Sequence, residues 1–233
     1  MTPTPLLAGA VIADLSRWNV ETRPQFETAV KAGLAGVIVK YTQGLYHDDP
    51  AAIEYAWDAH VAGVELLGGY HFGDSSDPAA QARHFLGAML GDYGGVLDGR
   101  LVMLDLEGDG SSTMSVAQAE RFVTEVKAGL GRWPVLYMGR DGPDGKRTGL
   151  PSAVLSQCDL MLPAYGDHAD LAPILPPGFR VPQGDADRGG CLRLWQFTDG
   201  TRHGGPFPGL GRIDQSRAVG FSSRAALAAW WGR

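Results

Sequence analysis

Two acidic residues separated by a single leucine, Asp105 and Glu107, are the side chains of this chain best suited to chemistry. They follow the apolar run Leu101-Val102-Met103-Leu104, which predicts a buried β-strand. Because side chains alternate faces along a strand, both carboxylates are expected on one face, roughly 6–7 Å apart. Crowding raises the pKa of one acid, which can hold a proton while its neighbour stays charged. Hydrolysis of a glycosidic bond by paired carboxylates needs that division of roles.

The same tripeptide also has a purely structural interpretation. Asp105 could cap the turn that follows the strand, and Glu107 could form a surface ion pair, because structural networks also collect acids. The tripeptide alone does not separate the two interpretations. The elements that would position the pair therefore have to be considered.

Apolar runs alternate along the chain with segments of helical periodicity. Strands are expected at residues 11–13, 37–40, 66–72, 101–104, 134–137, 160–162 and 192–195. Helices are expected from about Arg23 to Ala32, after Asp49-Pro50, after Asp77-Pro78, after the capping box Ser115-x-x-Gln118, and around Leu227, Trp230 and Trp231. In the second of these helices, Ile53, Trp57 and Val61 share one face at a spacing of four, which is typical of an amphipathic helix.

This alternation predicts an α/β fold in which crossovers join parallel strands. Seven or more strands without a linker favour a closed, irregular TIM-like (β/α) barrel over an open sheet, as one domain spanning residues 1–233. Helical periodicity fades after about Gly149, so the last third is expected to be strand-rich. Residues 165–190, rich in Gly, Pro and Asp, are interpreted as a long loop at the functional rim.

Composition excludes several classes of function. A formal net charge of −6 without a basic patch argues against binding to nucleic acid. The sequence also contains no run of 18 apolar residues, the length that a membrane-spanning helix needs. The six histidines show no metal-binding spacing, so neither a metal nor a cofactor is expected. Cys158 and Cys191 are interpreted as reduced thiols, although a disulfide between them stays open. The N-terminus lacks the features of a secretion signal.

A barrel places its chemistry at the carboxyl ends of its strands. Polar and aromatic residues stand at the predicted strand ends, and they would converge on one mouth: Asp14, Lys40, Tyr70, His71, Asp105, Glu107, Tyr137, Tyr165, Trp195, Gln196 and Asp214. Aromatic rings beside acids suit sugars, whose C–H faces stack on aromatic surfaces while their hydroxyls need polar partners.

An ordered series of short motifs resembles glycoside hydrolase family 25, the Chalaropsis-type lysozymes of bacteria, fungi and phage endolysins. The series runs from about residue 10 to 220: Ala13-Asp14-Leu15-Ser16, Val39-Lys40-Tyr41-Thr42-Gln43-Gly44, Gly69-Tyr70-His71-Phe72, Leu104-Asp105-Leu106-Glu107, Pro134-Val135-Leu136-Tyr137, Trp195-Gln196-Phe197-Thr198 and Ile213-Asp214. The resemblance implies an irregular barrel of about eight strands and about five helices. It also implies a β-1,4-N-acetylmuramidase, which cuts peptidoglycan between N-acetylmuramic acid and N-acetylglucosamine.

The resemblance further implies catalytic roles for four acids. Glu107 matches the general acid, whose pKa we expect Asp105 and desolvation to raise. Asp105 matches the residue thought to support the 2-acetamido group of the substrate as internal nucleophile. Asp14 and Asp214 match two further acids of the same mouth. The saccharide groove would be shaped by Tyr70, His71, Tyr137, Tyr165, Trp195 and Gln196, with Lys40 beside them.

Four of these residues also have plain structural interpretations. Asp14 could cap a turn with Ser16. His71 could be a hydrogen-bonded core histidine, and Trp195 could fill the barrel. Lys40 could compensate a barrel carboxylate without touching substrate.

The chain departs from the family pattern at several positions. Gln43 stands where Glu is common, Asn19 where Gln is frequent, and Gly108 where another acid often appears; the run from Met138 to Asp144 replaces the usual loop. No core acid is lost, so hydrolysis remains the favoured function, while the preferred peptidoglycan type stays open.

The expected partner is the peptidoglycan glycan strand, met by a monomer at the bacterial cell wall. A phage endolysin released through a holin, or an enzyme exported by another route, would fit. Two rival functions remain: a non-catalytic wall-binding module, and a glycosidase acting on chitin-type oligosaccharides.

Overall fold

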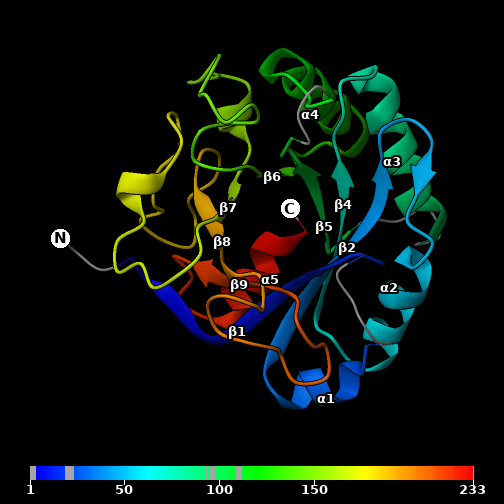
Figure 1. Cartoon of the computed structure of the whole chain (residues 1–233), viewed down its shortest axis with the longest axis vertical. Coiled ribbons are helices and arrows are strands. Elements are labelled where there is room, and N and C mark those ends of the chain that lie inside the picture. Colours follow the sequence, from blue (N-terminus) through cyan, green and yellow to red (C-terminus); the bar gives the residue numbers. More distant parts are fainter. Residues whose placement is uncertain (1–3, 19–23, 93, 95–97, 109–111, 233) are drawn as a thin grey trace.

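The computed structural model describes residues 4–18, 24–92, 94, 98–108 and 112–232, and its centre is a closed barrel (Figure 1). Eight strands form the ring in the order β1-β2-β4-β5-β6-β7-β8-β9, which closes because β1 pairs with both β2 and β9. Their bounds are β1 Leu6–Leu15, β2 Leu34–Gln43, β4 Leu66–Phe72, β5 Arg100–Asp105, β6 Val135–Tyr137, β7 Leu160–Pro163, β8 Leu192–Thr198 and β9 Asp214–Val219. A two-residue strand, β3 (His47–Asp48), pairs with β2 outside the ring. The predicted TIM-like barrel is confirmed.

Strand direction changes at one place in the ring. All neighbouring pairs from β1 through β8 are parallel, whereas β9 is antiparallel to both β8 and β1. The first residue of β9 therefore lies at the same mouth as the carboxyl ends of the other strands. Asp214, which we expected at the end of a strand, instead begins β9 and faces Asp14 in the register.

Five helices accompany the barrel in the described part of the chain, as predicted. They are α1 Phe26–Lys31, α2 Ala52–Val61, α3 Pro78–Asp92, α4 Val116–Leu130 and α5 Arg224–Trp231, and the 3-10 helices Leu155–Gln157 and Ala172–Ile174 lie in the last third. The Ser115 capping box is present, and the Asp77 carboxylate accepts a hydrogen bond from the Ala80 amide at 2.8 Å, satisfying one free N–H of α3. The first helix is shorter than expected, and Arg23 lies outside the described residues.

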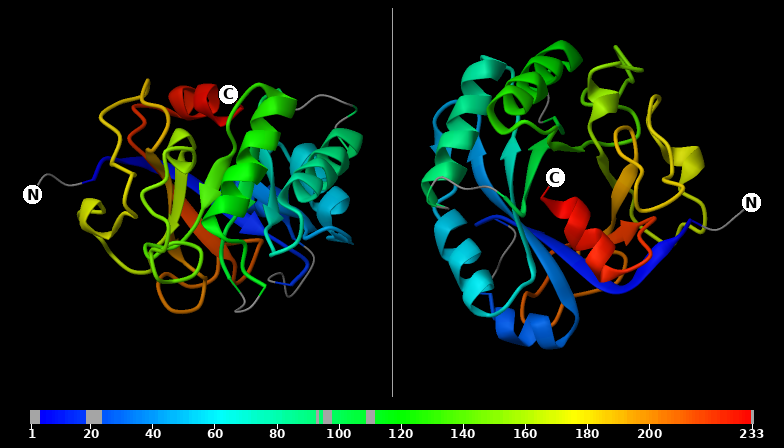
Figure 2. Two further views of the ribbon diagram at one scale, coloured as in Figure 1. Left: turned by 90° about the horizontal axis from the view of Figure 1, so that it is seen from above. Right: turned by 180° about the vertical axis from the view of Figure 1, so that it is seen from behind.

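Helix α5 closes the end of the barrel opposite the mouth (Figure 2). Its Trp230 and Trp231 are buried with apolar side chains of the barrel interior, including Leu66 and Leu101. The Trp231 indole donates to the Leu67 carbonyl at 2.7 Å, which satisfies its only polar group. Both indole rings therefore pack into the base of the barrel.

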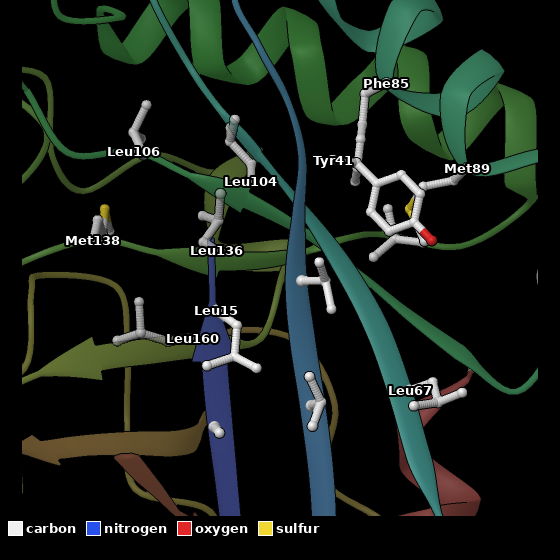
Figure 3. Close-up of a cluster of buried hydrophobic side chains, with 14 of the residues drawn as sticks. Leu15, Tyr41, Leu67, Phe85, Met89, Leu104, Leu106, Leu136, Met138 and Leu160 are labelled. Atoms are coloured by element: carbon white, nitrogen blue, oxygen red, sulfur yellow. The ribbon is translucent and has the colours of Figure 1, made fainter. Parts of the chain in front are cut away.

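A second apolar layer lies between the strands and the helices outside them. Figure 3 shows part of this layer, with Tyr41 of β2 beside Phe85 and Met89 of α3. A Cβ atom at Gly69 would lie 2.6 Å from the Tyr41 ring and 2.9 Å from the Met89 side chain, so β4 can approach α3 only with glycine there. The layer fixes α3 against β2 and β4.

The apolar face predicted for α2 points to solvent and not to the barrel. Ile53, Trp57 and Val61 are 64%, 64% and 66% exposed, and the helix instead buries Ala52, Tyr55, Ala56 and Ala59. Small residues let the helix axis approach the sheet closely, which larger side chains would prevent. Among the described residues, none of the helices has the length and hydrophobicity that crossing a bilayer requires.

Candidate active site

A polar cavity of about 120 Å³ opens at the mouth of the barrel. Eight of the residues that the sequence suggested line it: Asp14, Tyr70, Asp105, Glu107, Tyr137, Tyr165, Gln196 and Asp214. The wall also includes Met103, which we did not predict, although it stands two residues before Asp105 and so shares its face of β5. Its volume is below the range of pockets that hold a whole drug-sized ligand, so only part of a saccharide would fit inside.

The acids reach the cavity from three strands. Asp14 stands near the end of β1, directly opposite Asp214 at the start of β9. Asp105 ends β5, and the Leu106 amide still bonds to the Tyr137 carbonyl at 2.8 Å, so strand geometry continues beyond the assigned end. Side-chain alternation therefore carries through to Glu107, which lines the same cavity as Asp105.

A chain of hydrogen bonds crosses the mouth from β6 to β1. The Tyr137 hydroxyl donates to Gln196 Oε1 at 2.9 Å, and Gln196 Nε2 donates to both carboxylate oxygens of Asp14, at 3.2 and 3.4 Å. Burial raises the pKa of Tyr137, so its hydroxyl keeps its proton. This proton fixes the orientation of the Gln196 amide, which in turn holds the Asp14 carboxylate in place.

Burial and mutual repulsion shift two of the acids towards protonation. The pKa of Asp14 is raised well above its ordinary value by burial and then by the charges of Asp214 and Glu107. The pKa of Asp105 is raised well above its ordinary value by burial and then by the charges of Glu107 and Asp14. Such interacting acids share protons as a group instead of titrating one by one.

Glu107 is the more solvent-exposed of the two acids in the couplet. Its side chain is exposed, whereas Asp105 is only 7% exposed, so a bulky leaving group can reach Glu107. The protein around it still displaces enough water to raise the pKa of Glu107, and the Lys40 charge acts in the opposite direction. Desolvation is thus the expected cause that the structure bears out; the repulsion between the two acids raises the pKa of Asp105.

One oxygen of Asp105 has no internal partner. Oδ1 is buried and, within the part of the chain that the structure describes, accepts no hydrogen bond. A buried acceptor left without a donor costs free energy, of the order of 1–3 kcal/mol. A donor supplied by a bound substrate would remove that cost.

Three predicted site residues do not line the cavity. His71 is fully buried on the outer face of β4, where its ring nitrogens bond to Thr42 Oγ1 at 2.7 Å and Gln81 Oε1 at 2.9 Å. Trp195 is 1% exposed and donates to the Ala164 carbonyl, at 2.7 Å. Strand alternation turns both side chains away from the barrel interior, which favours the structural interpretation of each.

Lys40 is buried and is not among the residues that line the cavity. Its ammonium group donates to Gln43 Oε1 at 2.7 Å and lies 4.9 Å from the centre of the Phe72 ring. Its charge acts on both Asp105 and Glu107, as the shifts in their pKa indicate. It therefore compensates charge in this structure without direct access to the cavity.

The loop that follows Tyr165 and the departure from the family pattern at Gly108 can also be located in the structure. Tyr165 reaches the cavity, but its loop continues to the other side of the molecule, where Asp185 binds Ser222. A Cβ atom at Gly108 would lie 2.0 Å from the Thr113 hydroxyl oxygen, so an acidic side chain at this position would require Thr113 to move. Asn19 lies outside the described residues.

Cys158 and Cys191 are buried free thiols, and no cluster of three metal-binding side chains occurs in the described ranges.

A barrel whose mouth gathers carboxylates, one exposed and protonatable and one buried beside it, has the architecture of a glycosidase. The comparison with protein families agrees. The family described as "Glycosyl hydrolases family 25" matches residues 13–154, more than half of the chain. This chain belongs to glycosyl hydrolases family 25, as the ordered motifs predicted.

Solved structures with the same fold cover nearly the whole chain. A muramidase from Trichobolus zukalii is 26% identical, with 96% of this chain and 99% of that chain covered and a TM-score of 0.69. A family GH25 lysozyme from Aspergillus fumigatus is 25% identical, with coverages of 94% and 98% and a TM-score of 0.66. A bacterial lysozyme from Streptomyces coelicolor, at 22% identity, covers 97% and 98% with a TM-score of 0.74. No curated protein sequence matches the chain significantly.

Proposed function

We propose that this chain is a peptidoglycan hydrolase, a muramidase that cleaves the β-1,4 bond between N-acetylmuramic acid and N-acetylglucosamine. Membership of family 25 and the muramidase and lysozyme among the structural neighbours support this function. The observation that carries it is the couplet of Asp105 and Glu107, whose two side chains line one cavity together with Asp14 and Asp214.

In the proposed mechanism Glu107 is the general acid. Its raised pKa keeps a proton available, and its exposed position lets it protonate the leaving glycosidic oxygen as the C–O bond breaks. The buried Asp105 supports the 2-acetamido group of the substrate, whose N–H can donate to the unpartnered Oδ1 while its carbonyl oxygen approaches the sugar carbon. An N–H donor at Oδ1 would stabilise the charged form of Asp105, so the proton that the acids share would rest on Glu107.

The other cavity residues would bind and orient the sugar. Asp14, held by Gln196, and Asp214 opposite it would accept hydrogen bonds from hydroxyl groups and keep the couplet partly protonated. Tyr70, Tyr137 and Tyr165 would supply ring surface and hydroxyl groups. Lys40 would act on the acids through its charge.

We also propose that the chain is a single catalytic domain that works as a monomer at the bacterial cell wall. Cleavage of the glycan strand there would be bacteriolytic. Release as an endolysin through a phage holin, or another route of export, would bring it to that substrate.

Replacement Glu107→Gln tests the function. The variant should fold with an unchanged melting temperature and lose at least about 100-fold in the rate of clearing a cell-wall suspension, because the amide cannot donate the proton that the leaving group needs. Unchanged clearing would refute the role of Glu107.

Reducing-end release separates the rival functions. A muramidase releases reducing ends from purified sacculi, whereas a chitin-directed glycosidase prefers chitin oligomers. Binding to sacculi without any release of reducing ends would identify a non-catalytic wall-binding module.

A further inference from the structure

A second hollow lies at the rim of the barrel, outside the catalytic cavity. It has a volume of about 410 Å³ and is lined by Trp18, Gln43, Leu45, Tyr46, His47 and Asp74. Trp18 is 71% exposed and Tyr46 is 91% exposed. Two large aromatic side chains held in water around one hollow indicate a binding surface, since exposed apolar groups gathered at one place commonly mark such sites.

The loop that carries Tyr46 is fixed by contacts with Asp74 and with His84 of α3. Gly44 has a φ angle of +55°, and a Cβ atom there would lie 2.2 Å from a carboxylate oxygen of Asp74. His84 of α3 contacts the Gly44 carbonyl at 3.2 Å and Asp48 at 2.8 Å, one on each side of the tip. The backbone around Tyr46 is therefore preorganised, which lowers the entropy cost of binding.

Trp18 is brought to the same hollow by Asp49. The Asp49 carboxylate accepts a hydrogen bond from the Arg17 amide at 3.2 Å, while its own amide donates to the Tyr41 carbonyl at 2.8 Å. The Trp18 amide donates to Ser16 Oγ at 3.2 Å. The Arg17 guanidinium lies 4.6 Å from the centre of the indole and covers one face, leaving the exposed remainder of the ring for a ligand.

The hollow is close to the catalytic acids. Gln43, which lines it, is paired in register with Phe72, and Phe72 is paired with Asp105, so the two sites are two strand spacings apart, about 10 Å. Lys40 connects them, because it donates to Gln43 and acts by its charge on Asp105 and Glu107. A polymer longer than the catalytic cavity extends over the rim of the barrel, and the hollow lies on one side of that rim.

We propose that Trp18 and Tyr46 form an aromatic platform that binds a further sugar unit of the same glycan strand, outside the cleavage site. This proposal rests on the muramidase function and adds a preference for long strands. The rings would stack on the apolar face of an N-acetylhexosamine, and Gln43, His47 and Asp74 would meet its hydroxyl and acetamido groups. The occupant is a sugar because the lining combines flat apolar surface with neutral and charged hydrogen-bonding groups.

The test compares substrates of different length. For peptide-free glycan strands and for the shortest oligosaccharide that the enzyme cleaves, kcat/KM is measured for the wild type and for the double variant Trp18→Ala/Tyr46→Ala. The ratio of the two values, long over short, should fall about tenfold in the double variant, mainly through KM for long strands. Tyr46→Phe should retain the ratio, since it keeps the ring.

Trp57→Ala is the matched control, because Trp57 is a tryptophan of similar exposure, 64% against 71% for Trp18, and lines neither site. Its length ratio and melting temperature should equal those of the wild type. A double variant with the same ratio as Trp57→Ala, or one that loses equally on both substrates, would overturn the platform. A wild-type enzyme that releases no reducing ends from either substrate would instead refute the muramidase function.

Discussion

At the scale of single residues, the candidate site is defined by its carboxyl groups and by the lysine that acts on them. Four carboxylates share one small cavity, and Lys40 is the nearby cation whose charge acts on Asp105 and Glu107. Its partner Gln43 is neutral, where the family commonly has Glu. A neutral partner leaves the full lysine charge to act on the couplet, so the residue at position 43 is expected to influence the acids through Lys40.

Replacing Lys40 with Met should move the alkaline limb of the pH–rate profile. Lys40 lowers the pKa of Glu107, so its removal raises that pKa and keeps the general acid protonated to higher pH. The limb of kcat/KM that falls with rising pH should therefore shift upwards. Lys127→Met, at the far end of α4, serves as the control and should leave the limb in place. A downward shift in Lys40→Met would contradict the proposed electrostatics.

At the scale of elements, a buried histidine connects two strands with a helix. His71 of β4 bonds to Thr42 of β2 and to Gln81 of α3, and its ring stacks on Phe122 of α4 at a centroid distance of 5.0 Å. Burial lowers the pKa of His71 to about 4. The ring is therefore neutral when the protein is folded at neutral pH, which suits a structural role and not proton transfer to substrate.

Protonation of His71 should contribute to acid destabilisation. Between pH 6.5 and about 4 the unfolded chain binds a proton at this histidine and the folded chain does not, so the free energy of unfolding falls as the pH is lowered. His71→Gln should be less stable at pH 7, yet its stability should fall less steeply between pH 6.5 and 4. Urea unfolding at several pH values measures both slopes.

Other groups also make the free energy of unfolding depend on pH. The raised pKa values of Asp14 and Asp105 increase it as the pH is lowered, but this contribution is the same in the wild type and in His71→Gln. His60→Gln, which changes an exposed histidine of α2, should keep the wild-type slope. Parallel slopes for His71→Gln and the wild type would show that the buried ring does not resist protonation.

At the scale of the whole molecule, the barrel depends on segments at opposite ends of the chain. The family match ends at residue 154, before β7, β8, β9 and α5. Without these elements β1 and β6 would have unpaired edges, the base would be open and Asp214 would be missing from the site. The ring closes only when β9 pairs with β1.

This dependence predicts that the chain unfolds as one cooperative unit. Thermal unfolding followed by far-UV circular dichroism, by tryptophan fluorescence and by residual activity should give one coincident transition. A fragment that ends at residue 154 should not fold by itself. Two separated transitions, or a folded fragment, would contradict the single-domain proposal.

Much of this architecture follows from local patterns in the sequence. Apolar runs marked seven of the eight barrel strands, and Asp-Pro and capping-box signals marked the starts of three helices, since hydrogen bonds within a few residues decide those features. The placement of Asp105 and Glu107 on one face needed only the alternation of a strand. Eight of the eleven suggested site residues line the cavity.

The orientation of these faces relative to the barrel could be determined only from the closed ring of strands. Tyr70 and His71 are neighbours on one strand, and alternation says only that they face opposite ways; closure decides that Tyr70 faces the cavity and His71 faces α3. β9 enters the ring antiparallel to both of its neighbours, which brings Asp214 to the mouth. Helix α2 packs so that mainly small residues, not Trp57, face the sheet. Chain order and periodicity determine which residues share a face, but only packing between distant segments determines which face becomes the inside.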